Sequence, residues 1–138
     1  MKVLTLPFTK KIGITQATSA EYILQLNYNP DNLNHLNTIH ASASYALAET
    51  TSGFFLRTNF TDIADQTIPI MHSSTVKYKR GAIGDIFSKA NLKGTNVKEL
   101  SSLLMLKRKA VFIIQVKLFN EANEIIMSGE FEWFVTLK

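Results

Sequence analysis

Residues 34–55 (NHLNTIHASASYALAETTSGFF) constrain the fold more than any other part of the chain. Small and apolar residues recur there at spacings of three and four, which places them on one helix face. These residues are Ile39, Ala43, Ala46, Leu47, Thr50 and Phe54. Asn37 or Thr38 can cap the start, because a short side-chain oxygen accepts a hydrogen bond from a free amide. Glu49 is the only acid of this stretch, and a surface helix would carry a charged stripe, so we expect a helix buried almost all round.

Length and composition predict one globular domain over residues 1–138, with one core. The hydrophobic fraction of 46% is ordinary for such a domain. The absence of cysteine excludes disulfides and a thiol nucleophile. The short apolar run at the N-terminus does not resemble a signal peptide, and no apolar stretch approaches the ~20 residues of a membrane span. We therefore expect a cytoplasmic protein that does not associate with membranes.

The net charge of +4 favours anionic partners, including ligands that carry phosphate. The basic residues form no long tract, and aromatic residues are not interleaved with them as in RNA-binding motifs. We therefore do not expect nucleic acid as a ligand. The chain has three histidines without the spacing of a zinc site, so we expect no metal.

The remainder of the chain favours strands joined by short connections. Apolar alternation, or runs of Val, Ile and Phe, predict strands over residues 21–29, 69–80, 82–92, 107–120 and 125–137. The polar residues 57–66 predict a loop, and the lead-in of residues 1–20 has room for a short helix. Residues 97–106 fit either a short helix or the start of a strand.

The predicted order is a strand, a long helix and then about four strands. Short connections imply that sequential strands pair in an antiparallel sense. An apolar helix and a twisted antiparallel sheet bury each other when the sheet curls around the helix. The sequence therefore predicts an α+β fold with about five antiparallel strands wrapped around one long central helix.

This order resembles the hotdog fold, and the central stretch resembles the acyl-CoA thioesterases of the phenylacetyl-CoA thioesterase type. Those enzymes carry an Asn, a His six positions later with two small residues after it, and an acid nine positions after the His. Asn34, His40 and Glu49 stand at these spacings, and Ala41 and Ser42 follow the His. The family usually has Gly-Gly after the His and often Asp as the acid, and these departures suit an uncharacterised branch. The resemblance extends from about residue 20 to the end.

The resemblance implies hydrolysis of an acyl-CoA thioester. The amide of Ala41, at a helix start, would stabilise the oxyanion that develops on the carbonyl. Asn34 would position the carbonyl or a water molecule. Glu49 would act as the general base or as the nucleophile. Coenzyme A enters as part of the substrate, and no separate cofactor is expected.

The resemblance also implies supporting groups around these residues. His40 would hydrogen-bond the loop backbone, and Ser73 or Ser74 would support the attacking water. The family runs the acyl chain between two central helices. The residues that share the side of Glu49 on the helix, and would bind substrate there, are Tyr45, Ser52 and Gly53.

The spacing of the candidate residues indicates whether one subunit can form the site by itself. His40 and Glu49 are nine residues apart, about 900° of helix at ~100° per residue, so they point to opposite sides. Asn34 and Ala41 lie roughly a dozen ångströms from Glu49 along the axis, at ~1.5 Å per residue. One subunit cannot easily assemble this site, and the family forms it between subunits. We therefore expect a homodimer or homotetramer with sheets joined edge to edge.

An alternative function is a non-catalytic acyl- or CoA-binding or assembly domain, because a fold does not determine a function. A hydratase is disfavoured, since hotdog hydratases use an Asp and His pair that this helix does not present. Basic residues on or beside the strands could meet the phosphates of coenzyme A. They are Lys77, Lys79, Arg80, Lys107, Arg108 and Lys109.

Overall fold

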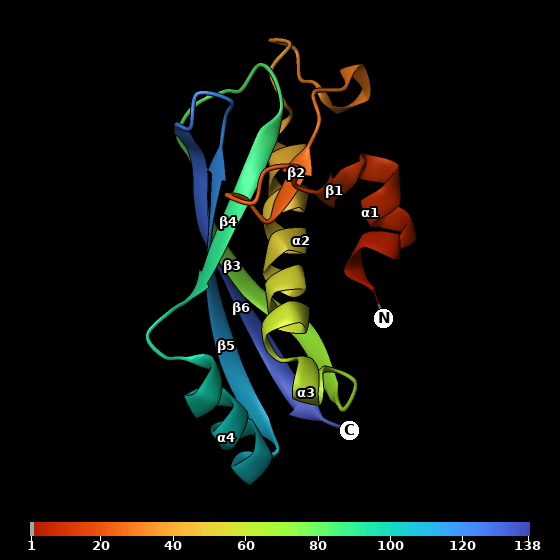
Figure 1. Ribbon diagram of the computed structural model, residues 1–138. Coiled ribbons are helices and arrows are strands. Elements are labelled where there is room, and N and C mark those ends of the chain that lie inside the picture. The colour runs from red at the N-terminus through yellow and green to blue at the C-terminus, as the bar shows by residue number, and fades with distance from the viewer. Residues whose placement is uncertain (1) are drawn as a thin grey trace.

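A computed structural model describes residues 2–138 and places one antiparallel sheet around one long helix (Figure 1). The strands are β1 (Ile14–Gln16), β2 (Leu24–Leu26), β3 (Thr67–Tyr78), β4 (Ile86–Leu92), β5 (Lys109–Phe119) and β6 (Ile125–Leu137). The α-helices are α1 (Pro7–Ile12), α2 (Ala41–Asn59), α3 (Thr61–Ala64) and α4 (Val97–Lys107). Two 3-10 helices, η1 (Val3–Thr5) and η2 (Pro30–Asn32), complete the elements.

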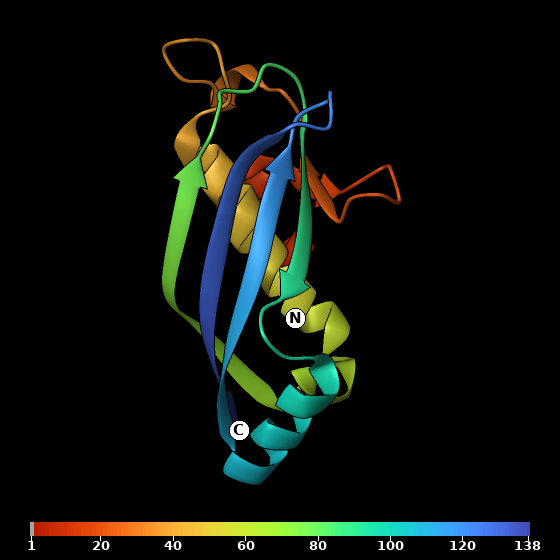
Figure 2. The ribbon, with the colours of Figure 1, turned by 90° about the vertical axis from the view of Figure 1, so that its left-hand side faces the viewer.

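The sheet runs in the order β1-β2-β4-β5-β6-β3, and all of its pairs are antiparallel, as predicted. Figure 2 shows the long strands β3, β6, β5 and β4 side by side, with α2 behind them. The sheet has six strands where about five were expected, because residues of the lead-in form β1 against β2. The expected α+β fold, a sheet wrapped around one helix, is confirmed.

The central helix α2 is buried almost all round, as expected. Every residue from 43 to 57 is buried or half-buried. The inner face of β5 packs against it with Phe112, Ile114 and Val116, which are almost fully buried. Burying an apolar side chain of this size stabilises a fold by about 1.5–3 kcal/mol. In residues 2–138, no helix is long and apolar enough to cross a membrane.

The start of α2 differs from the prediction. His40 caps the helix, with Nδ1 accepting a hydrogen bond of 3.0 Å from the Ser42 amide. The predicted caps were wrong because both residues belong to the preceding loop. Asn37 adopts a left-handed conformation (φ 59°), and the Thr38 hydroxyl accepts a hydrogen bond of 2.7 Å from the Asn34 side chain.

The end of α2 also differs from the prediction, because residues 57–66 are largely helical and not a loop. The helix α2 continues to Asn59, and α3 follows directly. The side chains of Thr58 and Asn59 bond to carbonyls of the preceding turn at 2.9 Å, which uses their polar groups within the helix. Leu56 and Phe60 are buried and tie this end to the core. Tertiary burial therefore outweighs the polar composition on which the loop prediction rested.

The other helices and strands lie where they were predicted, but they begin and end at different residues. The lead-in contains α1, which ends at Gly13 in a left-handed conformation (φ 88°). Residues 97–106, for which helix and strand were both open, form most of α4. The strand predicted over residues 21–29 shortens to β2, and its three residues are all buried because β1 and β4 flank it.

The edge strand β3 pairs only with β6 within residues 2–138. The register of this pair shifts between Met71 and Ser73, which places a bulge at His72. Ile68, Ile70 and Tyr78 expose much of their side chains along β3. A long edge strand presents unpaired backbone groups that can accept another strand.

A substitution at Gly129 of β6 tests how closely the neighbouring side chains pack against this position. A Cβ atom at this position would lie 2.8 Å from Val76 Cγ1 and 3.0 Å from Phe131 Cε2. We expect Gly129→Ala to lower the free energy of unfolding by about 1–3 kcal/mol, because overpacking forces neighbouring groups to move. Urea unfolding measures this loss, with Ser128→Ala as the adjacent control. Equal unfolding midpoints for the two variants would contradict the packing described.

Candidate active site

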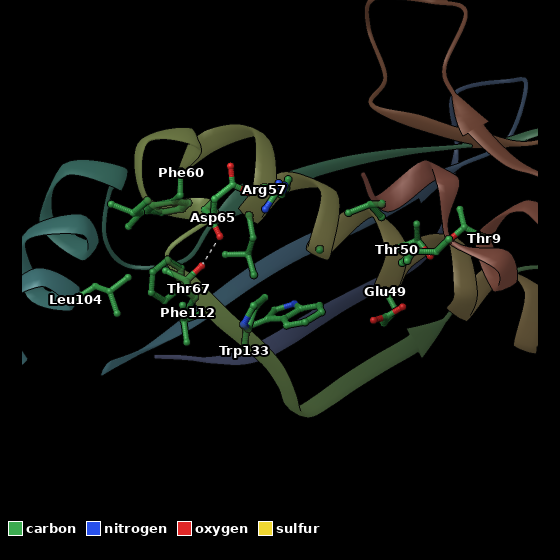
Figure 3. Close-up of a pocket in the computed structure, with 18 of the residues that line it drawn as sticks. Thr9, Glu49, Thr50, Arg57, Phe60, Asp65, Thr67, Leu104, Phe112 and Trp133 are labelled. Atoms are coloured by element: carbon green, nitrogen blue, oxygen red, sulfur yellow. Dashed lines mark hydrogen bonds and ion pairs between the residues drawn. The ribbon is translucent and has the colours of Figure 1, made fainter. Parts of the chain in front are cut away.

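A cavity of about 360 Å³ runs alongside the C-terminal half of α2 (Figure 3). Its walls come from the N-terminal segment, α2, α3, the ends of β3 and β6, and single residues of α4 and β5. Its lining is mostly apolar, and its size lies in the range of small-molecule pockets. Figure 3 shows Glu49 at one end of the cavity and Leu104 at the other.

The carboxyl group of Glu49 has an unusual setting. Glu49 is half-buried, and no side chain within residues 2–138 forms an ion pair or hydrogen bond with its carboxylate. Burial raises the pKa of Glu49 above its ordinary value of 4.5. A carboxyl group with a raised pKa at the end of a cavity can act as a general base closer to neutral pH.

A second, smaller hollow lies at the start of α2, and Ala41 and Asn34 line it. The Ala41 amide is among the first amides of the helix, which have no intrahelical acceptor, and it has no other protein acceptor among residues 2–138. It is therefore free to donate to a ligand. The Asn34 side chain accepts from the amides of Leu36 and Thr38 and donates to the Thr38 hydroxyl. The second hydrogen of the Asn34 Nδ2 group has no protein acceptor among residues 2–138, so Asn34 can donate to a ligand without losing a loop bond.

The predicted supporting residues contact other groups. His40 was expected to hydrogen-bond loop backbone, whereas its Nδ1 accepts from the Ser42 amide at the start of α2. The Ser73 hydroxyl donates to Glu132 at 2.8 Å, and the Ser74 hydroxyl shares a hydrogen bond of 2.7 Å with Tyr45. Neither serine hydrogen-bonds Glu49 in this chain.

Of the three predicted substrate-binding residues, one lines the cavity and two do not. Gly53 lines the cavity, whereas Tyr45 packs against Phe131 with ring centroids 5.7 Å apart and lies outside the cavity lining. Ser52 is buried, and its hydroxyl donates to the Glu49 carbonyl at 2.6 Å. The same hydroxyl accepts a hydrogen bond of 2.9 Å from the Trp133 indole. Ser52 therefore holds Trp133, which forms one wall of the cavity.

The candidate residues thus form two groups within one chain. Asn34 and Ala41 lie at the start of α2, while Glu49 and Gly53 face the cavity farther along it. The eight-residue separation of Ala41 and Glu49 corresponds to about 12 Å of helix at ~1.5 Å per residue. As their spacing predicted, the two groups lie apart within one chain. Within residues 2–138, no group of three or more His, Cys, Asp or Glu is placed to hold a metal ion.

Sequence reasoning missed several residues of the cavity wall. Trp133 carries no local signal beyond its place on the inner face of a strand. Thr9 belongs to the lead-in, which was predicted only as a possible helix. Arg57 and Asp65 form an ion pair of 2.5 Å among the lining residues, and Arg57 lowers the pKa of Asp65. These residues lie far apart in the sequence or within a segment predicted as a loop, so no motif could link them.

A family model described as a domain of unknown function (DUF4442) matches residues 2–135. The chain belongs to the DUF4442 family. No curated protein matches the sequence of this DUF4442 protein.

Solved structures share the fold of this DUF4442 protein over most of its length. A Pseudomonas aeruginosa protein of unknown function, described as a probable thioesterase, is 22% identical with a TM-score of 0.83, over 99% of this chain and 91% of its own. A Haemophilus influenzae thioesterase is 14% identical with a TM-score of 0.74, over 98% of this chain and 86% of its own. A Bacillus halodurans protein solved with CoA is 16% identical with a TM-score of 0.63, over 81% of this chain and 65% of its own. Identities this low show the fold alone, which is the predicted hotdog fold.

The burial of Glu49 should make the thermal stability of this DUF4442 protein depend on pH. Because burial raises the pKa of Glu49 in the folded state, the folded protein binds more protons than the unfolded chain. The stability contributed by the protonated carboxyl is complete below the unfolded pKa and is lost as the pH rises through the folded pKa. We therefore expect Glu49→Gln to have a higher Tm than the wild type at neutral pH.

The difference in Tm between the two proteins should disappear as the pH falls below the ordinary Glu value of 4.5. Thermal unfolding across this pH range measures it. Glu21→Gln is the control, because Glu21 is exposed and its ion pair with Lys89 lies at the surface. A Glu49→Gln protein with the lower Tm at neutral pH would contradict a desolvated, unpaired carboxylate.

Proposed function

We propose that this protein is an acyl-CoA thioesterase whose active site is completed between two subunits. One observation carries the proposal: an unpaired, half-buried Glu49 with a raised pKa stands at the end of a mostly apolar cavity. An unpaired carboxylate in such a place destabilises the fold, and groups of this kind cluster at functional sites. The thioesterases and the CoA-bound protein that share the fold support the same class of ligand and reaction.

The proposed reaction is hydrolysis of the thioester bond. As a general base, Glu49 takes a proton from water while the water oxygen bonds to the carbonyl carbon. The Ala41 amide of the partner subunit donates to the oxyanion that forms. The C–S bond then breaks, and the proton held by Glu49 passes to the thiolate of coenzyme A. As a nucleophile, Glu49 would instead attack the carbonyl carbon and displace the thiolate of coenzyme A, which takes a proton from solvent. Water would then hydrolyse the resulting anhydride, releasing the acid and restoring the Glu49 carboxylate.

The basic residues predicted to meet coenzyme A lie at two ends of the molecule. Lys79 and Arg80 line the hollow at the start of α2, and Arg80 also pairs with Glu124. The group of residues 107–109 lies at the end of α4, which is at the opposite end of the molecule in Figure 1. We propose that the phosphates of coenzyme A meet one of these two groups of basic residues.

The second subunit is proposed to join along β3. This strand is twelve residues long and ends the sheet, so its outer backbone groups are available for a partner strand. Pairing of two such edges about a two-fold axis would extend the sheet and bring two α2 helices together. A homodimer is the smallest assembly that completes the site, and a homotetramer would contain two such dimers.

Ala41→Pro tests the oxyanion donor without disturbing the helix. Proline lacks the amide hydrogen, is favoured at the first helical position, and suits the extended backbone of His40 (ψ 139°) before it. We expect kcat for acyl-CoA hydrolysis to fall about a hundred- to a thousandfold with little change in Tm. Ala41→Gly keeps the amide and should retain activity. Full activity of Ala41→Pro would remove this amide from the mechanism.

Glu49→Gln tests the acid and, in a mixed dimer, the shared site. The change is nearly isosteric and removes the basicity, so kcat should fall at least about a hundredfold. A dimer of one Ala41→Pro and one Glu49→Gln subunit, isolated with two affinity tags, has one intact site and should regain about half of the wild-type activity. An inactive mixed dimer would place the site within one chain. Binding of acyl-CoA without turnover by the wild type would support the non-catalytic alternative.

A further inference from the structure

One stripe of α2 lines the cavity from Glu49 to the end of the helix. Gly53, Leu56 and Phe60 follow Glu49 at steps of four, three and four residues, so they share one helix face. Trp133 faces this stripe, and Figure 3 shows its indole between Glu49 and Phe60. The cavity therefore extends along the helix axis, away from the candidate base.

Gly53 lets the Trp133 indole lie directly against the helix. A Cβ atom at Gly53 would lie 3.4 Å from the indole ring. The backbone of Gly53 is that of an ordinary helix residue, and glycine is less favourable than alanine at such a position. The Ser52 hydroxyl accepts a hydrogen bond of 2.9 Å from the indole N–H. The indole is thus held close to α2, which leaves the remaining width of the cavity to a ligand.

The length and the volume of the cavity agree on the size of chain that it can hold. Phe60 follows Glu49 by eleven residues, which corresponds to about 16 Å at ~1.5 Å per residue. An extended hydrocarbon chain with bonds of about 1.5 Å advances roughly 1.3 Å per carbon, so about twelve carbons span this distance. The volume of about 360 Å³ corresponds to about twelve water-sized groups of ~30 Å³, and a methylene group has a similar size.

The polar side chains in the far part of the cavity are bonded to other protein groups. Arg57 forms an ion pair of 2.5 Å with Asp65, and the Lys138 ammonium group donates to the Asp65 carbonyl at 2.8 Å. The Thr67 hydroxyl donates to the Ala64 carbonyl at 2.9 Å. A hydrocarbon chain can therefore lie beside these side chains without replacing any of these bonds.

We propose that the cavity binds the acyl group as an extended straight chain of about eight to twelve carbons, which lies along α2 past Trp133 and ends near Ala64. This assignment rests on the proposed function, which places the thioester carbonyl at Glu49. Ala64 of α3 lines the far part of the cavity, so its small side chain helps to set the longest chain that fits. A compact aromatic acyl group would leave this far part unfilled.

The dependence of hydrolysis on chain length tests the proposal. We expect kcat/KM to rise from butyryl-CoA by up to about fourfold per methylene, because each methylene leaves water for an apolar wall. The maximum should lie between octanoyl-CoA and dodecanoyl-CoA, with lower values for hexadecanoyl-CoA and phenylacetyl-CoA. A maximum at butyryl-CoA or phenylacetyl-CoA, or a value that does not change with length, would overturn the proposal.

Ala64→Phe tests the far end of the cavity by filling it. We expect kcat/KM for dodecanoyl-CoA to fall at least about tenfold and the maximum to move to shorter chains. Thr61→Phe is the matched control, because Thr61 is an exposed residue of α3 that does not line the cavity. An equal change at every chain length in Ala64→Phe, or no change at all, would overturn the proposal.

Binding of straight-chain primary alcohols to the wild type separates this inference from the proposed function. These alcohols are neutral, so Glu49 does not repel them, and they need no turnover. Trp133 is the only tryptophan of the chain, so its fluorescence reports ligands that enter the cavity. An affinity that rises from butanol to about twelve carbons and then levels off would uphold the inference even if no acyl-CoA is hydrolysed. An affinity that does not depend on length, or no binding, would overturn it.

Discussion

The structure depends on the burial of one long helix inside a curled sheet. Small residues such as Ala43, Ala46 and Ala48 let the strands approach α2 closely, and the core of β5 and β6 packs on it. Burial on almost every side leaves little room for charge, and Glu49 is the one acid that α2 carries. The same burial raises the pKa of Glu49, so the constraint that forms the core also prepares the candidate catalytic group.

The helix also separates the parts of the candidate site. Its start presents the free amide of Ala41 beside basic residues, and its middle presents Glu49 to an apolar cavity. A rigid helix holds these groups about 12 Å apart at ~1.5 Å per residue, so chemistry that needs both calls for a second copy. The free edge of β3 offers a route to that copy.

Much of this fold could be predicted because its signals are local. The apolar spacing within residues 34–55 predicted α2, and alternation predicted β3 to β6. The predicted cap was wrong because several neighbouring polar residues can cap a helix. In the folded chain the Thr38 hydroxyl is bonded to Asn34, and His40 caps α2. The cavity could not be predicted, since its walls meet only in the folded chain, as when Ser52 holds Trp133. Motif spacing did find Glu49, because the motif lies within one continuous stretch of sequence.

The central claim is that Glu49 is a desolvated carboxylate that acts on a thioester. The pH dependence of kcat/KM for acyl-CoA hydrolysis tests it most directly. Because the base must be ionised and burial raises its pKa, activity should fall as the pH decreases through an apparent pKa above 4.5. An acid limb at or below 4.5, or a rate that does not change across this range, would contradict the account.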